Sequence, residues 1–174
     1  NIFNDVAATK FTCGLALLSA PFFIAGHIFA LIFNYPPDGY SLPYSIAFGI
    51  GCIFYAILGL FYLRKVLLHF FDEKTTMWTI VLLVFGTNFL LNATGGRAFT
   101  HTFSFTFLAI LIWKTIKFHQ FPTIKNGFLL GASLAILGLI RFPDLLFGLI
   151  PLFWNVNRLN GFKHKMIFFK NNHL

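Results

Sequence analysis

The chain alternates between long apolar runs and short polar gaps. At about 1.5 Å per helical residue, the first two runs can cross a hydrocarbon core of about 30 Å, the next two nearly can, and the last two are short. The pattern predicts an all-α fold, a polytopic bundle of about six transmembrane helices. The apolar runs cover residues 13–33, 44–63, 77–93, 99–113, 127–140 and 144–155.

The last two runs are separated only by the sequence RFPD at residues 141–144. Pro143 disfavours a continuous helix and pushes the residue before it toward extended backbone. Two arrangements fit. We favour two spans joined by a tight turn. The alternative is a broken, re-entrant pair buried inside the protein, where irregular backbone can be satisfied.

Composition indicates lipid as the solvent of this chain. Hydrophobic residues make up 57% of the 174 positions, the mean hydropathy is +0.78, and 10% of residues are charged, against about 25% in an average soluble domain. The net charge of +8 does not indicate nucleic-acid binding, because the cations lie in gaps between apolar runs and form no basic face. We therefore expect an integral membrane protein with no nucleic-acid partner.

The Lys and Arg residues of the gaps are divided unequally between two sets of segments. One set holds ten of them and the other holds three. By the positive-inside rule the richer side faces the cytoplasm, which predicts an extracytoplasmic N-terminus and a cytoplasmic C-terminus. The richer set comprises residues 64–76, 114–126 and the C-terminal tail, and the poorer set comprises the N-terminal stretch and residues 34–43, 94–101 and 141–144.

The two ends of the chain suggest a piece of a longer protein. The sequence begins with Asn, and no signal-peptide n-region precedes the first apolar run. We expect residues 1–156 to form part of a transmembrane domain. Residues 157–174, which are basic and amphipathic, are expected to form a cytoplasmic tail or the start of a further helix.

The cations of the poorer side, Lys10, Arg97 and Arg141, need a reason other than orientation. Arg97 lies four residues before His101, so at the start of a helix both side chains would share a face. A helix N-terminus that carries Arg and His suits a phosphate. The alternative is that Arg97 reaches to lipid headgroups while His101 caps or packs.

The other charged residues of this side also allow two explanations each. Arg141 between two apolar runs suits a ligand contact, but an ion pair with Asp144 would serve equally. Lys10 alone fits an interfacial anchor. Asp38 lies in a Pro-Pro-Asp-Gly sequence, which favours a structural role in a turn. If the topology holds, all of these side chains lie at one face of the membrane.

The residues carry no familiar catalytic motif. There is no Ser-His-Asp or HExxH spacing and no phosphate-binding loop, and Cys13 and Cys52 lie in apolar runs without metal-ligand spacing. The sequence therefore identifies no cofactor and no metal site. Asn88 and Asn92, in the third run, are expected to hydrogen-bond between helices.

An ordered series of segments resembles the GT-C superfamily of integral-membrane glycosyltransferases, closest to its dolichyl-phosphate-mannose protein mannosyltransferase-like branch. In KFTCGLALLSAPFFIAGHIFA, a Lys-aromatic step, a glycine and a Pro-aromatic step stand at Lys10–Phe11, Gly14 and Pro21–Phe22. No single motif is specific, and the order of segments over residues 8–156 carries the resemblance. The other segments are DGYSLPYSIAFGIGCIFYAILGLFYLRKVL, FGTNFLLNATGGRAFTHTFSFTFLAILIW and GFLLGASLAILGLIRFPDLLFGLIPLFW.

The resemblance implies a multi-pass enzyme of the bacterial inner membrane. Such an enzyme transfers a sugar from a polyprenyl-phosphate donor to a glycan, lipid or protein acceptor at the extracytoplasmic face. It further implies that Lys10 contacts the donor phosphate and that the catalytic acid lies upstream of this chain, which would be an internal fragment. Some relatives use a divalent metal, although no ligand set is recognisable here. Together with charge placement, the resemblance predicts a donor-phosphate site formed by Lys10, Arg97, His101 and Arg141, with Asp38 and Asp144 in support.

Two other classes of function stay open. A transporter or flippase for a lipid-linked intermediate would carry ionisable groups near the bilayer midplane and an internal repeat, and the sequence shows neither. A non-catalytic membrane subunit would lack the upstream acid.

Overall fold

The computed structural model describes residues 13–94 and 100–154. Regular structure within these ranges is helical and includes no strand, which confirms the predicted all-α class for this part of the chain. The elements are α1 (Cys13–Ile32), α2 (Leu42–Phe70), α3 (Glu73–Gly86), α4 (Phe89–Thr94), α5 (Thr100–Gln120), α6 (Ile124–Ile140), the 3₁₀ helix η1 (Phe142–Gly148) and α7 (Leu149–Phe153).

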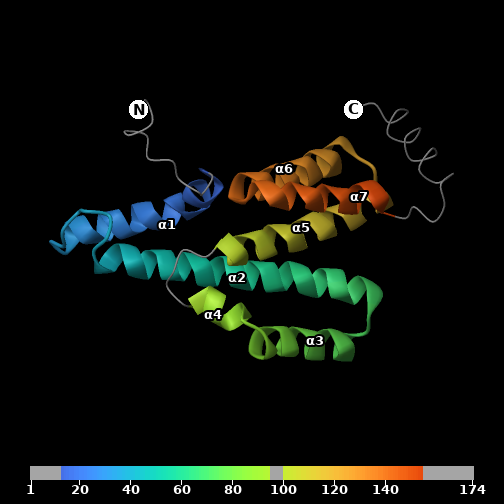
Figure 1. Ribbon diagram of the computed structural model, residues 1–174, viewed down its shortest axis with the longest axis horizontal. Coiled ribbons are helices and arrows are strands. Elements are labelled where there is room, and N and C mark those ends of the chain that lie inside the picture. Colours follow the sequence, from blue (N-terminus) through green and yellow to red (C-terminus); the bar gives the residue numbers. More distant parts are fainter. Residues whose placement is uncertain (1–12, 95–99, 155–174) are drawn as a thin grey trace, which may run out of the picture.

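The helices run roughly along one direction and pack in a stack (Figure 1). α2, the longest, pairs with α1 along its first half and lies between α5 and the α3–α4 segment along its second half. α6 and the η1–α7 segment cover the side of α5 that faces away from α2.

The core lies where α1, α2, α5 and α6 meet. It is built from the buried residues Cys52, Tyr55, Phe103 and Ile140, with half-buried leucines and phenylalanines around them. Tyr55 fixes this junction, because its hydroxyl donates to the Leu18 carbonyl of α1 at 3.1 Å. Burial of these side chains and this interhelical hydrogen bond together join the four helices.

Helix ends follow local sequence signals. Asp72 caps α3 by accepting hydrogen bonds from the backbone N–H groups of Lys74 and Thr75, each at 3.1 Å. Thr123 caps α6 by accepting from the Asn126 N–H at 3.3 Å. Pro43 stands in the first turn of α2, where the missing N–H has no consequence.

The apolar runs and the helices differ where polar side chains act locally. α2 and α5 continue past residues 63 and 113 to Phe70 and Gln120, because lysine stems extend an apolar helix into the polar gap. The third run is not one helix. Thr87 interrupts it between α3 and α4 by donating to the Leu83 carbonyl at 2.6 Å and accepting from the Phe89 N–H at 3.1 Å.

The fifth and sixth runs form a short antiparallel hairpin. Leu145 packs on Gly138, and Leu134 packs on Gly148. The return segment, Phe142–Phe153, begins as a 3₁₀ helix and is about 20 Å long by its rise per residue, which is shorter than a hydrocarbon core. The favoured arrangement of two complete spans therefore finds no support in the described part of this segment, and its shortness fits the broken pair better.

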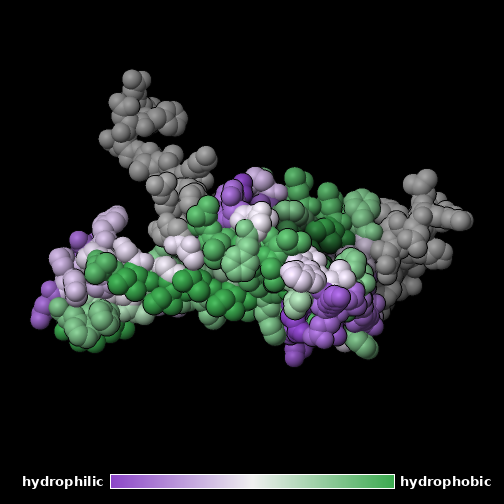
Figure 2. Space-filling view, turned by 90° about the horizontal axis from the view of Figure 1, so that it is seen from below, coloured by the Kyte–Doolittle hydropathy of each residue, from purple (hydrophilic) through white to green (hydrophobic). Residues whose placement is uncertain are grey.

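Two described helices, α1 and α2, are long and apolar enough to cross a membrane, by length and composition alone. Only 11% and 28% of the residues in their most apolar windows are buried inside the structure, so these helices turn large apolar side chains outward. Figure 2 shows hydrophobic surface along most of one face, with hydrophilic residues gathered at the left-hand end, near the middle and toward the right-hand end. Exposed apolar surface on this scale calls for a lipid or protein neighbour.

The predicted orientation needs a correction. α1 and α2 are antiparallel, so the Cys13 end of α1 and the turn that holds Asp38 lie at opposite ends of a 20-residue helix, about 30 Å apart. Grouping the N-terminal stretch with residues 34–43 on one membrane face was therefore wrong. An even number of crossings also returns a chain to its starting side, so six spans and termini on opposite sides cannot both hold.

The N-terminal end of α1 packs closely on the end of α6. A Cβ added at Gly14 would lie 2.2 Å from the Leu139 carbonyl oxygen, so only glycine allows this approach. The contact brings the start of α1 level with the end of α6, where Arg141 follows.

We expect Gly14→Ala to lower the thermal unfolding midpoint in detergent micelles by several degrees, since overpacking costs about 1–3 kcal/mol. Gly131→Ala in α6 is the matched control, because no atom lies within 4 Å of its added Cβ. The control should leave the midpoint unchanged or raise it slightly. The midpoints are measured by circular dichroism. Equal midpoints for the two variants would contradict the close contact.

Candidate functional site

Two predicted site residues meet where α5 begins and α6 ends. The Arg141 guanidinium (Nη1) lies 3.5 Å from His101 Nδ1, at the outer limit of hydrogen bonding. Arginine can only donate, so Nδ1 is the acceptor in this contact. The residues are 40 positions apart in sequence. The fold of α5 against α6 is therefore what brings them together.

Asp144 lies behind this pair rather than in it. Its carboxylate is buried and accepts a hydrogen bond from the Ser104 hydroxyl at 2.5 Å. Asp144 also sits in the first turn of η1, where the helix dipole favours a negative charge. Because Ser104 is on α5, the bond fixes the start of η1 against α5 and so positions Arg141 next to His101.

The alternative that Arg141 forms an ion pair with Asp144 is not realised. No salt bridge joins these residues, although both are described, and the Asp144 carboxylate is engaged by Ser104. Arg141 is half-buried and has no carboxylate partner within the described ranges. A guanidinium held in this way can bind an oxyanion.

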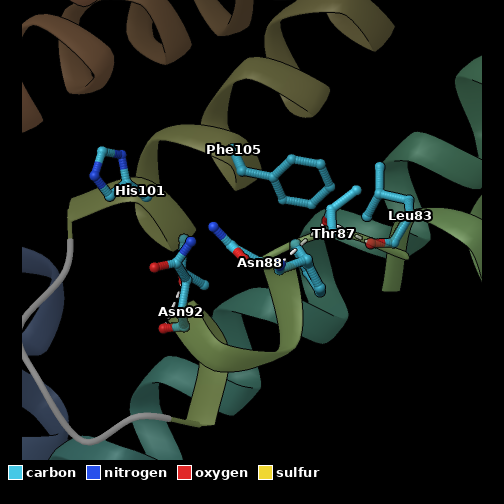
Figure 3. Close-up of a pocket in the computed structure, with 8 residues that line it drawn as sticks. Leu83, Thr87, Asn88, Asn92, His101 and Phe105 are labelled. Atoms are coloured by element: carbon cyan, nitrogen blue, oxygen red, sulfur yellow. Dashed lines mark hydrogen bonds between the residues drawn. The ribbon is translucent and has the colours of Figure 1, made fainter. Parts of the chain in front are cut away.

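A mainly apolar pocket of about 340 Å³, with two side-chain amides in its lining, opens beside His101. Thr87, Asn88 and Phe89, at the break between α3 and α4, form part of its lining. Figure 3 shows Asn88 and Asn92 on one side of this space and His101 and Phe105, from α5, on the other. The pocket is lined by Leu83, Thr87, Asn88, Phe89, Asn92, His101, Thr102 and Phe105.

The two amides of the pocket were expected to hydrogen-bond between helices. Instead, the bond between α4 and α5 is made by the Thr102 hydroxyl, which donates to the backbone carbonyl of Asn92 at 3.1 Å. The side-chain amides of Asn88 and Asn92 make no hydrogen bond to any other described residue and remain open to a ligand. A Gly-Thr step before two amides in an apolar run is the sequence signal for this pocket.

The remaining predicted site residues do not join the pair. Lys10 and Arg97 lie outside the described residues. Asp38 lies in the turn between α1 and α2, where one carboxylate oxygen accepts from the backbone N–H groups of Tyr40 and Ser41, each at 2.8 Å. This is the structural role that its turn sequence favoured, and the distance along α1 removes Asp38 from the site. In the described segments no three His, Cys, Asp or Glu side chains gather to hold a metal ion.

Comparison with known proteins identifies no relative of this chain. No family model matches the chain, and no curated protein and no solved structure shows significant similarity to it. The resemblance to GT-C glycosyltransferases therefore stays a prediction from the sequence.

The Asp38 turn predicts an acid-dependent loss of stability. Hydrogen bonds from the backbone of Tyr40 and Ser41 lower the pKa of Asp38. A lowered pKa means that the ionised carboxylate stabilises the fold above its ordinary pKa, and that this contribution is lost as the pH falls through the folded value, below about pH 4. We expect Asp38→Asn to reduce the drop in unfolding midpoint between pH 6 and pH 3 in micelles. Identical pH profiles for variant and parent would refute this role.

Ser104→Ala tests the bond that positions η1. Removal of the hydroxyl leaves a buried carboxylate without its donor, which costs about 1–3 kcal/mol and lowers the thermal midpoint. Ser19→Ala serves as control, since the Ser19 hydroxyl only bonds carbonyls of its own helix. A loss no larger than that of the control would show that the Ser104–Asp144 bond does not hold η1.

Proposed function

We propose that this chain is part of a multi-pass membrane glycosyltransferase that takes its sugar from a polyprenyl-phosphate donor. The observation that carries the proposal is the Arg141–His101 pair, which offers a guanidinium with no carboxylate partner among the described residues, at the start of α5 and level with the middle of α2. A phosphate carried on a lipid is an anion that can enter an apolar helix bundle. The guanidinium would bind it and stabilise the charge that develops on the leaving phosphate.

Membrane insertion is supported by the outward-facing apolar side chains of α1 and α2. We propose about six spans in the bacterial inner membrane. Lys65 and Lys117 lie near the ends of α2 and α5 that are opposite the Arg141–His101 pair. The positive-inside rule would put those lysines in the cytoplasm and the pair on their extracytoplasmic side.

The pocket beside His101 would receive the sugar of the donor. It shares His101 with the phosphate-binding pair, so phosphate and sugar would occupy adjoining spaces. The amides of Asn88 and Asn92, which bond no other described residue, can exchange hydrogen bonds with sugar hydroxyls, while the Phe105 ring offers an apolar face to a sugar ring. Lys10 and Arg97 are proposed to complete the phosphate site from outside the described residues.

The described residues do not provide an obvious general base. Asp144 is buried and bonded to Ser104, and Asp38 caps a turn, so neither carboxylate faces the pocket. In this proposal the base is the upstream acid that the resemblance implies. The acceptor, whether glycan, lipid or protein, would approach from that side, and a divalent metal could assist there.

One observation favours a transporter or flippase as the second candidate. Asp144 is a buried ionisable group in an apolar bundle, and such groups often mark ion or proton pathways. Its bond to Ser104 already explains it structurally, which is why we rank this function second. A non-catalytic subunit would retain the Arg141–His101 pair but would transfer no sugar.

Arg141→Ala tests the proposed function. In proteoliposomes with a radiolabelled polyprenyl-phosphate sugar, we expect the variant to release polyprenyl phosphate about 10²-fold more slowly than the parent, because an anion-stabilising donor is lost. Arg64→Ala is the matched control, since Arg64 is an exposed arginine at the other end of the bundle, paired with Glu73. The control should keep full activity.

Three results would count against the transferase. Release that is equally slow in both arginine variants would remove the assigned role of Arg141. No release by the parent from a panel of donors, with labelled lipid crossing the bilayer, would support the flippase instead. Neither release nor crossing, with the protein folded, would favour the subunit.

A further inference from the structure

We propose that the ends of α2 and α5 opposite the Arg141–His101 pair form a binding site for the headgroup of an anionic phospholipid. Two lysines from different helices converge there on one indole ring. The ammonium nitrogen of Lys65, on α2, lies 5.8 Å from the Trp113 ring centroid, and that of Lys117, on α5, lies 5.0 Å from the same ring. Two positive charges are thus held around a single side chain.

Neighbouring aromatic rings keep both ammonium groups close to apolar surface. Lys65 Nζ lies 4.2 Å from the ring centroid of Phe61 and 5.4 Å from that of Tyr62. Lys117 Nζ lies 6.0 Å from the centroid of Phe121. Contacts of this kind attract the cation to the ring faces and hold the lysine stems along the helices, instead of letting the charges extend into water.

The nearby carboxylates are already engaged. The acidic residues at this end of the bundle are Asp72, which caps α3, and Glu73, which pairs with Arg64 at 3.0 Å. Consequently neither Lys65 nor Lys117 forms a salt bridge with any residue of the described segments. The Trp113 indole N–H likewise finds no acceptor there and remains a further donor. The described residues therefore supply no anion for the two cations and the donor around this ring.

The positions of Lys65 and Lys117 along their helices fit that of a lipid headgroup. By the helical rise, Lys65 lies about 8 Å and Lys117 about 5 Å before the ends of their helices. Phe61 and Phe121 beside them are 52% and 62% exposed, so apolar surface for acyl chains adjoins the charges. A phosphodiester with attached acyl chains satisfies both features, whereas a free phosphate satisfies only the charges.

The inference depends on the membrane location and not on the transferase reaction. The site is at the other end of α5 from the Arg141–His101 pair, about 24 Å away by the rise between residues 101 and 117. Loss of lipid binding would therefore leave the proposed donor site untouched, and a failure of the transferase proposal would leave this site standing.

The test measures lipid binding to the purified protein in micelles. Phosphatidylglycerol and phosphatidylcholine are titrated separately, and the rise in thermal midpoint gives an apparent affinity for each. We expect the parent to bind phosphatidylglycerol at least tenfold more tightly than phosphatidylcholine, and the double variant Lys65→Gln, Lys117→Gln to lose that preference. Lys74→Gln, Lys125→Gln is the matched control, because it removes the same charge from exposed lysines at the same end and should keep the preference.

Several outcomes would overturn the proposal. The first is a parent protein that shows no preference for phosphatidylglycerol. This outcome does not depend on the folding of any variant. Equal loss in the control variant would show a general surface-charge effect. Full competition by inorganic phosphate at millimolar concentration would show an anion site without lipid. If the double variant does not fold, Lys65→Arg, Lys117→Arg, which keeps the charges, must retain the preference.

Discussion

The close approach of α2 and α5 is the contact on which the rest of the structure depends. A Cβ at Gly59 would lie 2.7 Å from the Phe105 ring and 2.8 Å from Thr106 Oγ1, so the glycine lets α5 lie directly on α2. Thr106 then reaches the Tyr55 carbonyl at 2.7 Å. Helices in an apolar solvent gain little by burying apolar surface, so small residues and hydroxyl groups must hold them together. The buried hydroxyls of α5 serve this purpose along its first half.

With α5 fixed on α2, its other side chains connect the remaining elements. Thr102 joins α4, Ser104 joins η1 through Asp144, and Trp113 lies beside Lys65 of α2. The same helix therefore forms one wall of the pocket beside His101 at its start and carries part of the lysine cluster near its end. A displacement of α5 along α2 would separate His101 from Arg141 and Trp113 from Lys65 together, so the two proposed sites share one structural support.

The sequence predicted much of the fold and less of the site. Long apolar runs were enough to predict helices, and the turn sequence around Asp38 was enough to favour its structural role. The break at Thr87 was missed because threonine is compatible with a helix. Here its backbone is extended and its hydroxyl accepts from the Phe89 N–H, which starts a new helix. The bond between Ser104 and Asp144 spans 40 residues, and no local pattern specifies which helices become neighbours. For the same reason the sequence grouped Asp38 with Arg141, although α1 separates them.

A shortage of negative charge accounts for both proposed sites. In the described part of the chain each carboxylate is used internally: Asp38 and Asp72 bond backbone N–H groups, Glu73 pairs with Arg64, and Asp144 accepts from Ser104. Cations therefore remain without protein carboxylates at both ends of α5. Charges at the edge of an apolar bundle are further stabilised by an anion that tolerates the same surroundings. Lipid phosphates are such anions, so the proposed donor phosphate at one end and the proposed phospholipid headgroup at the other both answer this shortage of negative charge.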